Sequence, residues 1–537
     1  MRNKIIENIP KISLNQSLSD YTEIITDFYL NNTSDRYRKE RGQYFTPKEI
    51  SQLMIKQFNK IDKKEEIKIL DPGAGVGIFE SVFCEHILTN KNMIKKIIFD
   101  LYENDKKLSV LLDINLKTCK KFMRVNDIEF GYKILNEDFI LSNDSILNNQ
   151  DNSLGTYDFV ICNPPYFKIN KNSLYLQKFN NIINFPPNIY PIFMALSGKL
   201  LKNDGQMTIL TPRSYCSGWF FKNFRKLFFN LVKPCKIHLF NSREHVFKKY
   251  NVIQENIILT AIKTSRKPKY IFISLSDGIP PEHNKPKIRR TNYEKVIVKM
   301  KGDIQMRIPR SDLDESIAFY IDNEPYNLDS LGFKVATGPV VPFRKKDLLS
   351  KELCSMGDFV PLIWMHNIVQ GTVKWPIQKK GKSIAIMNSD KSRRILVPNK
   401  NYILVKRFSN KEGKQRIYAG IYFPDISNSD VVGIENHVNY IYKKNNKIDI
   451  DELYGLTALL NSRLYNRYLQ MTNGSTQVNA SEINQLPIPS YEILKSIGYS
   501  TKNLAQINNL EQEKIILNLL KIDQQTTERL IESEFIR

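Results

Sequence analysis

The stretch Tyr157-Asp-Phe-Val-Ile-Cys-Asn-Pro-Pro-Tyr-Phe167 joins a strand signal to an abrupt stop. Its apolar run ends at Asn163, and the two prolines that follow lack the N–H groups that a further strand residue would donate. A short, continuous apolar run is typical of a strand that is buried on both faces, so we expect a parallel α/β sheet. Such sheets bind ligands at the carboxyl ends of their strands, where Asn163 and Tyr166 fall.

The turn suits one kind of chemistry, the attack of an exocyclic amino nitrogen on a methyl donor. Such a nitrogen is a poor nucleophile because its lone pair is delocalised into the ring. In Asn163-Pro164-Pro165-Tyr166, the Asn163 side-chain oxygen and the Pro164 carbonyl oxygen can bind its two N–H groups and stabilise the charge that develops in the transition state. Tyr166 would stack on a base taken out of its helix. The alternative is a plain strand-ending turn with a surface tyrosine, and four residues alone do not decide.

Length, composition and charge narrow the class of protein. The chain has 537 residues, of which 42% are hydrophobic, 29 are Phe and 26 are Tyr. This composition predicts a globular chain of roughly two to four domains rather than a disordered one. The formal net charge of +23 makes a polyanion the first partner to consider, chiefly nucleic acid. The alternative is a lysine-rich surface that contacts only solvent.

Cysteine spacing and hydropathy indicate which classes are not expected. The six cysteines stand singly, with no Cys-x-x-Cys pair, so the sequence predicts neither a zinc or other metal site nor a disulfide framework. Residues 1–10 lack the apolar core of a signal peptide. No run approaches the roughly eighteen apolar residues of a membrane span. We therefore expect a cytoplasmic protein without a membrane partner.

Ligand-binding signals recur at the ends of the preceding strands. Residues 67–70 are a strand candidate that runs into Asp71-Pro-Gly-Ala-Gly-Val-Gly77, a loop whose glycines allow a ligand to approach the backbone. Glu103 ends a second strand, where an acid is well placed to bind two ribose hydroxyls. Asp138 follows a third strand and can accept from an adenine amino group, with Phe139 beside the ring. Each signal is weak alone; together they predict an adenosine-bearing cofactor, most simply S-adenosylmethionine.

In order and spacing, these motifs resemble the gamma-class DNA adenine-N6 methyltransferases of type II restriction-modification systems. That class carries a Gln-Tyr-Phe-Thr-Pro segment, here residues 43–47, then a glycine loop, an Asn-Pro-Pro-Tyr (NPPY) turn and a carboxyl-terminal target-recognition domain. The resemblance runs from about residue 40 to about residue 490. It implies S-adenosylmethionine as cofactor, duplex DNA as substrate and an adenine extruded by base flipping as methyl acceptor. A separate cognate restriction endonuclease is a second partner to expect in the bacterial cytoplasm.

The resemblance also implies roles for individual residues. Tyr44, Phe45 and Thr46 would lie against the methionine end of the cofactor. Phe193 matches an aromatic position near the cofactor, although a helix-core residue fits that position equally well. Phe247 would contact the extruded base together with Tyr166. The remaining cofactor contacts would come from Asp71, Gly73, Ala74, Gly75, Glu103, Asp138, Phe139 and Asn163.

The fold that this resemblance implies has two parts. The first is a Rossmann-like S-adenosylmethionine-dependent methyltransferase domain, with a mostly parallel seven-stranded sheet and one antiparallel strand. The second is a mixed α/β target-recognition domain. The expected boundaries are an N-terminal helical segment at 1–40, the catalytic domain at 41–270, a Pro-rich basic linker or arm at 271–325, the recognition domain at 326–490 and closing helices at 491–537.

Basic residues alternate with aromatic and small ones in the recognition half. Lys and Arg neutralise phosphates, whereas Arg, Gln and Asn can read base edges. Each basic stretch also fits a solvated surface, but similarity to the recognition domain of the class favours DNA contact. The candidate DNA-binding residues are Arg344, Lys406, Arg407, Gln477 and Asn479.

Other functions fit parts of the pattern. An RNA guanine-N2 or protein glutamine methyltransferase would use the same turn for another planar amino or amide group. A fused restriction-modification enzyme would need a nuclease domain, for which the about forty residues before Gln43 are too few. A catalytically inert DNA-binding regulator would have no need of an intact Asn163, Tyr166 and Asp71.

Overall fold

The computed structural model describes residues 9–13, 15–59, 61–90, 93–148, 155–170, 172–180, 188–240, 255–276, 278, 286–300, 302–352, 359–409, 415–443, 447–472, 477–503 and 510–533. The chain divides into two compact units, Met1–Ile308 and Pro309–Arg537. Within the described ranges, no helix combines the length and the apolar character that crossing a bilayer requires.

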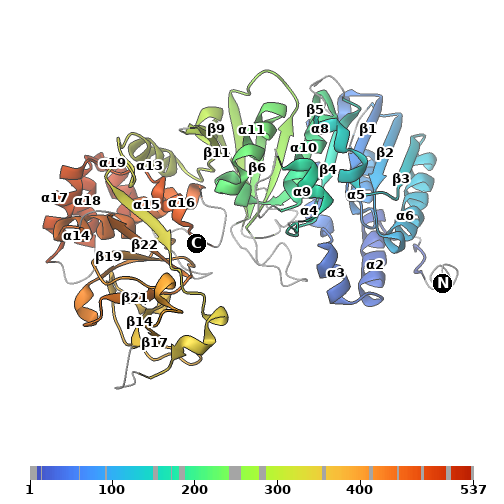
Figure 1. Cartoon of the computed structure of the whole chain (residues 1–537). Helices are drawn as coiled ribbons and strands as arrows, with labels where there is room; N and C mark the ends of the chain where they lie inside the picture. Colours follow the sequence, from blue (N-terminus) through green and yellow to red (C-terminus); the bar gives the residue numbers. More distant parts are fainter. Residues whose placement is uncertain are drawn as a thin grey trace. The chain divides into compact units, whose positions relative to one another are not determined.

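Nine strands of the described part of the first unit form one sheet, in the order β3-β2-β1-β4-β5-β7-β6-β8-β9 (Figure 1). Strands β1 to β5 run parallel, β7 is antiparallel between β5 and β6, and β9 is antiparallel to β8. The strands are β1 (Glu66–Asp71), β2 (Lys96–Tyr102), β3 (Glu129–Leu135), β4 (Tyr157–Cys162), β5 (Leu201–Pro212), β6 (Lys233–Phe240), β7 (Asn256–Ile262), β8 (Tyr270–Ser276) and β9 (Lys287–Asn292).

This sheet differs from the expected seven strands with one antiparallel member. Strands β8 and β9 extend it beyond β6, and β9 is a second antiparallel strand. Both lie largely in 271–325, so the prediction of a linker or arm there is wrong. The Pro-rich, basic composition suggested a linker, but Ile271 and Ile273 are fully buried and anchor β8 in the core. Two further strands, β10 (Ile297–Met300) and β11 (Asp303–Met306), pair antiparallel.

Helices cover both faces of the sheet, because alternate residues of its central strands bury apolar side chains on opposite sides. In β4, Phe159 and Ile161 pack with helices α4 to α6, whereas Val160 and Cys162 pack with α10 and α11. The helices of this unit are α2 (Leu18–Asn31), α3 (Asp35–Arg41), α4 (Lys48–Ile55), α5 (Ile78–Thr89), α6 (Lys106–Val125), α7 (Phe139–Ser142), α8 (Asp144–Asn148), α9 (Leu174–Phe179), α10 (Tyr190–Leu200), α11 (Lys222–Leu231) and α12 (Tyr293–Val296).

The N-terminal helices are fastened to the first unit. The Ser19 N–H donates to Glu85 Oε1 (2.7 Å), and Thr22 Oγ1 lies 2.7 Å from Ser81 Oγ, so α2 is hydrogen-bonded to α5. Figure 1 shows α2 and α3 at the lower end of the sheet. Their position matters because residues of both helices line the cavity described below.

The described part of the second unit contains two sheets and a group of helices. Its described strands form the orders β12-β22-β19-β20-β16-β15 and β13-β17-β14-β21-β18. The helices pack on the first of these sheets, where Ile403, Val405 and Ile441 share a core with Leu456 and Ile497. The elements are α13 (Asp312–Asp322), β12 (Phe333–Thr337), β13 (Leu349–Ser350), β14 (Phe359–Ile363), β15 (Ile368–Val369), β16 (Thr372–Val373), β17 (Ala385–Met387), β18 (Val397–Pro398), β19 (Tyr402–Lys406), β20 (Ala419–Tyr422), β21 (Val431–Ile434), β22 (Val438–Lys443), α14 (Ile450–Asn461), α15 (Arg463–Thr472), α16 (Ala480–Asn484), α17 (Tyr491–Thr501), α18 (Leu510–Leu519) and α19 (Gln524–Glu532).

Two glycines let α14 and α17 pack backbone to backbone. A Cβ atom on Gly498 would lie 1.8 Å from the Asp451 carbonyl oxygen, and one on Gly455 would lie 2.1 Å from the Leu494 carbonyl oxygen. Both obstacles are main-chain atoms, which cannot rotate away as a side chain can. The contact between the two helices therefore requires glycine at both positions.

We expect Gly498→Ala to lower the free energy of unfolding by roughly 1–3 kcal/mol or more, because the added methyl group pushes the two helices apart. Urea denaturation measures this change. Gly131→Ala in β3 is the matched control, since its Cβ would meet its nearest atoms at 3.7 and 3.9 Å, which is ordinary contact. Equal losses in the two variants would contradict the close packing of α14 and α17.

Candidate active site

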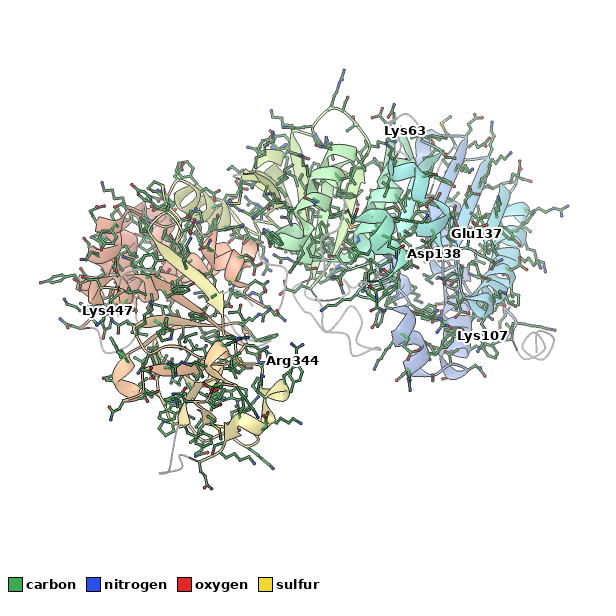
Figure 2. All side chains as sticks on the ribbon, viewed as in Figure 1. Lys63, Lys107, Glu137, Asp138, Arg344 and Lys447 are labelled. Atoms are coloured by element: carbon green, nitrogen blue, oxygen red, sulfur yellow. The ribbon has the colours of Figure 1, made fainter. Side chains whose placement is uncertain are left out.

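A cavity of about 420 Å³ lies at the carboxyl ends of strands β1, β2, β3 and β4. It brings together residues from distant parts of the chain, because the parallel strands all end at this edge. Figure 2 labels two residues of its wall, Glu137 and Asp138, just after β3. The predicted cofactor residues that line the cavity are Tyr44, Phe45, Thr46, Gly73, Ala74, Gly75, Glu103, Asp138, Phe139, Asn163 and Phe193.

The side chain of Asn163 is oriented by the segment that precedes α4. Its Nδ2 donates to the Tyr44 carbonyl oxygen (2.9 Å) and to Thr46 Oγ1 (3.0 Å). Both partners accept, so they determine which end of the amide is the nitrogen and leave Oδ1 as the acceptor end. The Tyr166 hydroxyl donates to Oδ1. An amide oxygen has two lone pairs, so Oδ1 can also accept an N–H of a substrate.

Tyr166 lies beside Asn163 and packs among other aromatic rings. Its ring centroid is 6.2 Å from that of Tyr44 at 19° between planes, and 6.3 Å from that of Tyr190 at 87°. Its hydroxyl also lies 2.8 Å from the Leu210 carbonyl oxygen. Burial raises the pKa of this hydroxyl well above its usual range, so it stays protonated and donates. Tyr44 was predicted to lie against the cofactor, but its nearly parallel contact with the Tyr166 ring was not predicted.

Glu103 is tied to the glycine loop by main-chain hydrogen bonds. Its Oε2 accepts from the Gly75 N–H (3.0 Å), and its Oε1 accepts from the Asp105 N–H (2.8 Å). Gly75 has φ of +58°, in the left-handed region that favours glycine. Burial raises the pKa of Glu103 to about 8. The acid therefore lies at the cavity wall where the loop turns, with lone pairs free for further donors.

Asp71, predicted to shape the cofactor pocket, is fully buried and is not part of the cavity wall. Its Oδ1 accepts from the Gly73 N–H (2.9 Å), and burial raises its pKa to about 7. Glu80, in the first turn of α5, is also fully buried, and burial together with the charge of Asp71 raises its pKa well above the usual range. Asp71 thus reaches the cavity only indirectly, through the loop residue Gly73.

The predicted adenine acceptor, Asp138, is engaged within the chain. Its Oδ1 accepts from the Leu141 N–H (2.9 Å) at the start of α7, and its Oδ2 accepts from the Tyr175 hydroxyl. Tyr175 also lines the cavity. The rings of Phe139 and Phe193 lie 5.3 Å apart. Phe193 belongs both to the core and to the cavity wall, so its contact with the cofactor stays a prediction.

Comparison with known proteins identifies the family. A family model described as N-6 DNA Methylase matches residues 19–319. The chain belongs to the N-6 DNA methylase family. It is 34% identical over 488 residues to Type II methyltransferase M.PstI of Providencia stuartii, covering 90% of this chain and 93% of the relative. It is 33% identical over 499 residues to Type II methyltransferase M.BsuBI of Bacillus subtilis, covering 90% and 95%.

Membership of the N-6 DNA methylase family confirms the resemblance predicted from the sequence, and with it a DNA methyltransferase of restriction-modification type. Among solved structures, the fold is similar to that of the Type IIL restriction-modification enzyme MmeI in complex with DNA. That similarity has a TM-score of 0.50 at 13% identity and covers 91% of this chain and 72% of the other. It supports the fold alone.

A polar network links the N-terminal helices of this methylase to its cavity. Asp105 Oδ2 accepts from the Tyr29 and Tyr37 hydroxyls (both 3.0 Å) and from Gln43 Nε2 (3.2 Å). The Asp105 N–H donates to Glu103, as described above. Sequence reasoning missed Asp105, Tyr29 and Tyr37, because an Asp before a helix looks like an ordinary N-cap. Tyr175 was missed because a tyrosine in a short helix belongs to no motif.

The predicted contacts to DNA are placed only in part. Phe247, the second predicted base contact, lies outside the described residues. In the second unit, Arg344 is exposed, with its guanidinium 5.4 Å from the Phe343 ring centroid (Figure 2). Lys406 ends β19, and burial, with a contribution from the charge of Lys379, lowers its pKa.

The other predicted DNA-binding residues are Arg407, Gln477 and Asn479, and main-chain contacts join their segments just after the end of β19. The Val478 N–H donates to the Arg407 carbonyl oxygen (2.8 Å), and Gln477 forms a bridge with Phe408. The Asn479 main-chain N–H and its Nδ2 both donate to Glu482 Oε2, at 2.8 and 3.3 Å. The Asn479 side chain thus supports the start of α16 in this structure.

We expect Asn163→Ala to abolish methyl transfer while binding of S-adenosylmethionine is largely retained. The substitution removes the amide oxygen, whereas the other residues that line the cavity stay in place. Single-turnover transfer of a labelled methyl group and calorimetric cofactor binding measure the two effects separately. Loss of cofactor binding in parallel with activity would contradict a role confined to the amino group.

We expect the titration of Glu103 to appear in the pH dependence of the free energy of unfolding. Its usual pKa is 4.5 and its folded pKa is about 8, so between these values the folded chain keeps a proton that the unfolded chain has released. The stabilisation from this group is therefore complete at low pH and is lost as pH rises through about 8. The glutamine of Glu103→Gln stays neutral. In this variant the free energy of unfolding should therefore fall less steeply with pH, by a slope that corresponds to at most one bound proton. Urea unfolding of the ligand-free protein at several pH values tests this, and unchanged slopes would refute it.

Proposed function

We propose that this methylase transfers the methyl group of S-adenosylmethionine to N6 of an adenine at a specific sequence in duplex DNA. Family membership supports the reaction class. The observation that carries the proposal is the orientation of Asn163, whose amide nitrogen is engaged by Tyr44 and Thr46. Its oxygen is thereby left as an acceptor beside a cavity that also contains the glycine loop and Glu103.

The residues at the cavity fit S-adenosylmethionine. The cavity volume of about 420 Å³ suits a ligand of nucleoside size. Glu103 would accept from the ribose hydroxyls, and Phe139 and Phe193 would flank the adenine. For Asp138 to accept from the adenine amino group, its Oδ2 must share or exchange the Tyr175 hydroxyl. The other proposed contacts are Tyr44, Phe45, Thr46, Gly73, Ala74, Gly75 and Asn163, whereas Asp71 would act only by holding Gly73.

In the proposed mechanism, the chain positions the target amino group and stabilises its developing charge. The bound cofactor supplies an electrophilic methyl group. The Asn163 oxygen and the Pro164 carbonyl oxygen accept the two amino N–H groups, which localises the nitrogen lone pair and aims it. After attack the amino nitrogen is cationic and acidic, so water can remove its proton and no dedicated base is needed.

Close packing holds the Asn-Pro-Pro-Tyr turn in place. Pro165 lies next to the N-terminal segment, since a Cβ on Gly42 would lie 3.3 Å from Pro165 Cβ and 3.0 Å from the Phe167 ring. Gly42 has φ of +63°, so the close approach and the backbone conformation both call for glycine. The N-terminal segment and the Asn-Pro-Pro-Tyr turn therefore pack directly on each other.

Duplex DNA is the proposed substrate, and the net charge of +23 predicts binding that weakens as salt rises. Arg344, Lys406 and Arg407 are proposed to contact DNA from the second unit, the proposed target-recognition domain, together with Gln477 and Asn479. We also propose a separate cognate restriction endonuclease and a cytoplasmic location, which the resemblance to type II restriction-modification methyltransferases implies.

The function is tested by expressing the chain in a bacterial host that lacks adenine methylation and mapping modified bases by single-molecule sequencing. We expect N6-methyladenine at one recurring sequence. An unmodified genome, from a host that makes well-folded protein, would contradict the proposal and favour an RNA or protein acceptor or an inert DNA-binding regulator.

We expect Tyr166→Ala to lower kcat/KM on duplex DNA by about 5- to 150-fold, the equivalent of the 1–3 kcal/mol that stacking on one base contributes. Tyr166→Phe is the matched control, because it keeps the ring and removes only the hydroxyl bonded to Asn163 and Leu210. Steady-state kinetics on an oligonucleotide duplex measure both variants. Equal losses would assign the role to the hydroxyl, and an unchanged rate in the alanine variant would exclude stacking.

A further inference from the structure

Two large aromatic side chains, Trp219 and Phe220, are exposed at the sheet edge that carries the proposed active site. They are 52% and 43% exposed. They lie in the short 3-10 turn η3 (Trp219–Phe221), which follows the carboxyl end of β5. Their ring centroids are 5.6 Å apart at 80° between planes, so they form one aromatic tip. Adjacent exposed rings at a functional edge mark a contact surface.

The aromatic tip is connected to the Asn163 turn by a row of rings. Phe221, the next residue, is partly buried against the core, and its ring stacks on Tyr190 at 5.9 Å and 30°. Tyr190 in turn meets Tyr166 edge to face. The Tyr166 hydroxyl reaches the Leu210 carbonyl oxygen near the end of β5. The exposed pair therefore precedes a residue, Phe221, that is linked through Tyr190 to Tyr166 of the proposed base-binding site.

A fully buried arginine fixes the backbone beneath the aromatic tip. Arg225 of α11 is 0% exposed. It donates to the Tyr215 and Gly218 carbonyl oxygens, which precede the tip, at 2.9 and 2.7 Å. Its other nitrogens donate to the Ile304 carbonyl oxygen and pair with the Asp303 carboxylate, the latter at 2.6 Å. A buried guanidinium is tolerated only when its partners are well placed, so this turn presents the two rings from a rigid base.

The charge around the aromatic tip indicates which kind of molecule would bind there. Residues 213–230 contain no Asp or Glu. Two of their four Lys and Arg residues, Arg213 and Arg225, are buried and paired with Glu255 and Asp303, which leaves Lys222 and Lys226. Lys222 and Lys226 are four residues apart in α11, hence on one face of the helix, and Lys226 is exposed. Exposed rings beside cations suit a nucleic acid, whose bases stack on aromatic side chains while its phosphates bind lysine. An apolar protein partner would not require the lysines.

We propose that Trp219 and Phe220 enter the duplex beside the target adenine, where they stack on the neighbouring base pair and fill the space that the extruded adenine leaves. This inference rests on the proposed function. Extruding a base costs the stacking energy that the base loses, and aromatic side chains that stack in its place offset part of that cost. The aromatic tip would stack on the base pair that remains in the duplex, while Tyr166 would stack on the extruded adenine. Trp219 and Phe220 are thus positioning residues for base extrusion and take no part in methyl transfer itself.

The test compares two duplexes that carry the methylated sequence found by mapping. In one the target adenine is paired, and in the other it faces an abasic site and is already unpaired. In the full-length chain, the Trp219→Ala/Phe220→Ala variant should lose roughly 10- to 100-fold in single-turnover rate on the paired duplex. On the unpaired duplex it should lose less than about threefold, because an adenine without a pairing partner leaves the helix at lower cost. Fluorescence of 2-aminopurine at the target position should show less extrusion in the variant.

Phe272→Ala is the matched control, since Phe272 on β8 is also 43% exposed. It should behave as wild type on both duplexes. Trp219→Ser alone is the second variant if the double variant fails to fold, because its side chain is more than half exposed (52%). Equal losses on the two duplexes, or no loss on the paired one, would overturn the inference. A wild-type chain that methylates neither duplex would instead contradict the proposed function.

Discussion

The orientation of one amide is the constraint on which the proposed chemistry depends. Asn163 stands at the end of a central strand, and an amide in such a place can turn over and exchange its nitrogen and oxygen. Two acceptors from the segment before α4, the Tyr44 carbonyl oxygen and Thr46 Oγ1, remove that freedom. That segment is in turn tied to α6 through Gln43 and Asp105. The segment that follows the N-terminal helices therefore orients the proposed catalytic turn as well as lining the cavity.

The acids of the site are stabilised in a common way. Glu103 accepts from the Gly75 and Asp105 N–H groups, Asp71 from the Gly73 N–H, and Asp138 from the Leu141 N–H and the Tyr175 hydroxyl. Neutral donors of this kind orient the acid group, while burial raises the pKa of Glu103 to about 8 and that of Asp71 to about 7. With or without its proton, such a group can still accept from ligand hydroxyl and amino groups, which is what an adenosine-bearing cofactor offers.

The sheet was predictable where local rules act alone. The apolar run of β4 and the two prolines after Asn163 determined where that strand ends, and the sheet edge followed. The prediction failed at 271–325, where the Pro-rich, basic composition indicated a linker more strongly than the short alternating run of β8 indicated a strand. The alternation of β8 buries Ile271 and Ile273, but short alternating runs become strands only when a neighbour supplies the other half of the ladder. Here β6 and β9 supply it.

By itself, the sequence determined the carboxyl-edge site: the glycine loop, Glu103, Asp138 and the Asn-Pro-Pro-Tyr turn. It could do so because each depends on residues within one strand-to-loop junction. Only the tertiary structure decided that Tyr175 meets Asp138, that Tyr29 and Tyr37 meet Asp105, and that Arg225 supports an exposed aromatic tip at Trp219 and Phe220. These contacts join side chains from separate elements, and no local pattern encodes which distant residues packing will bring together.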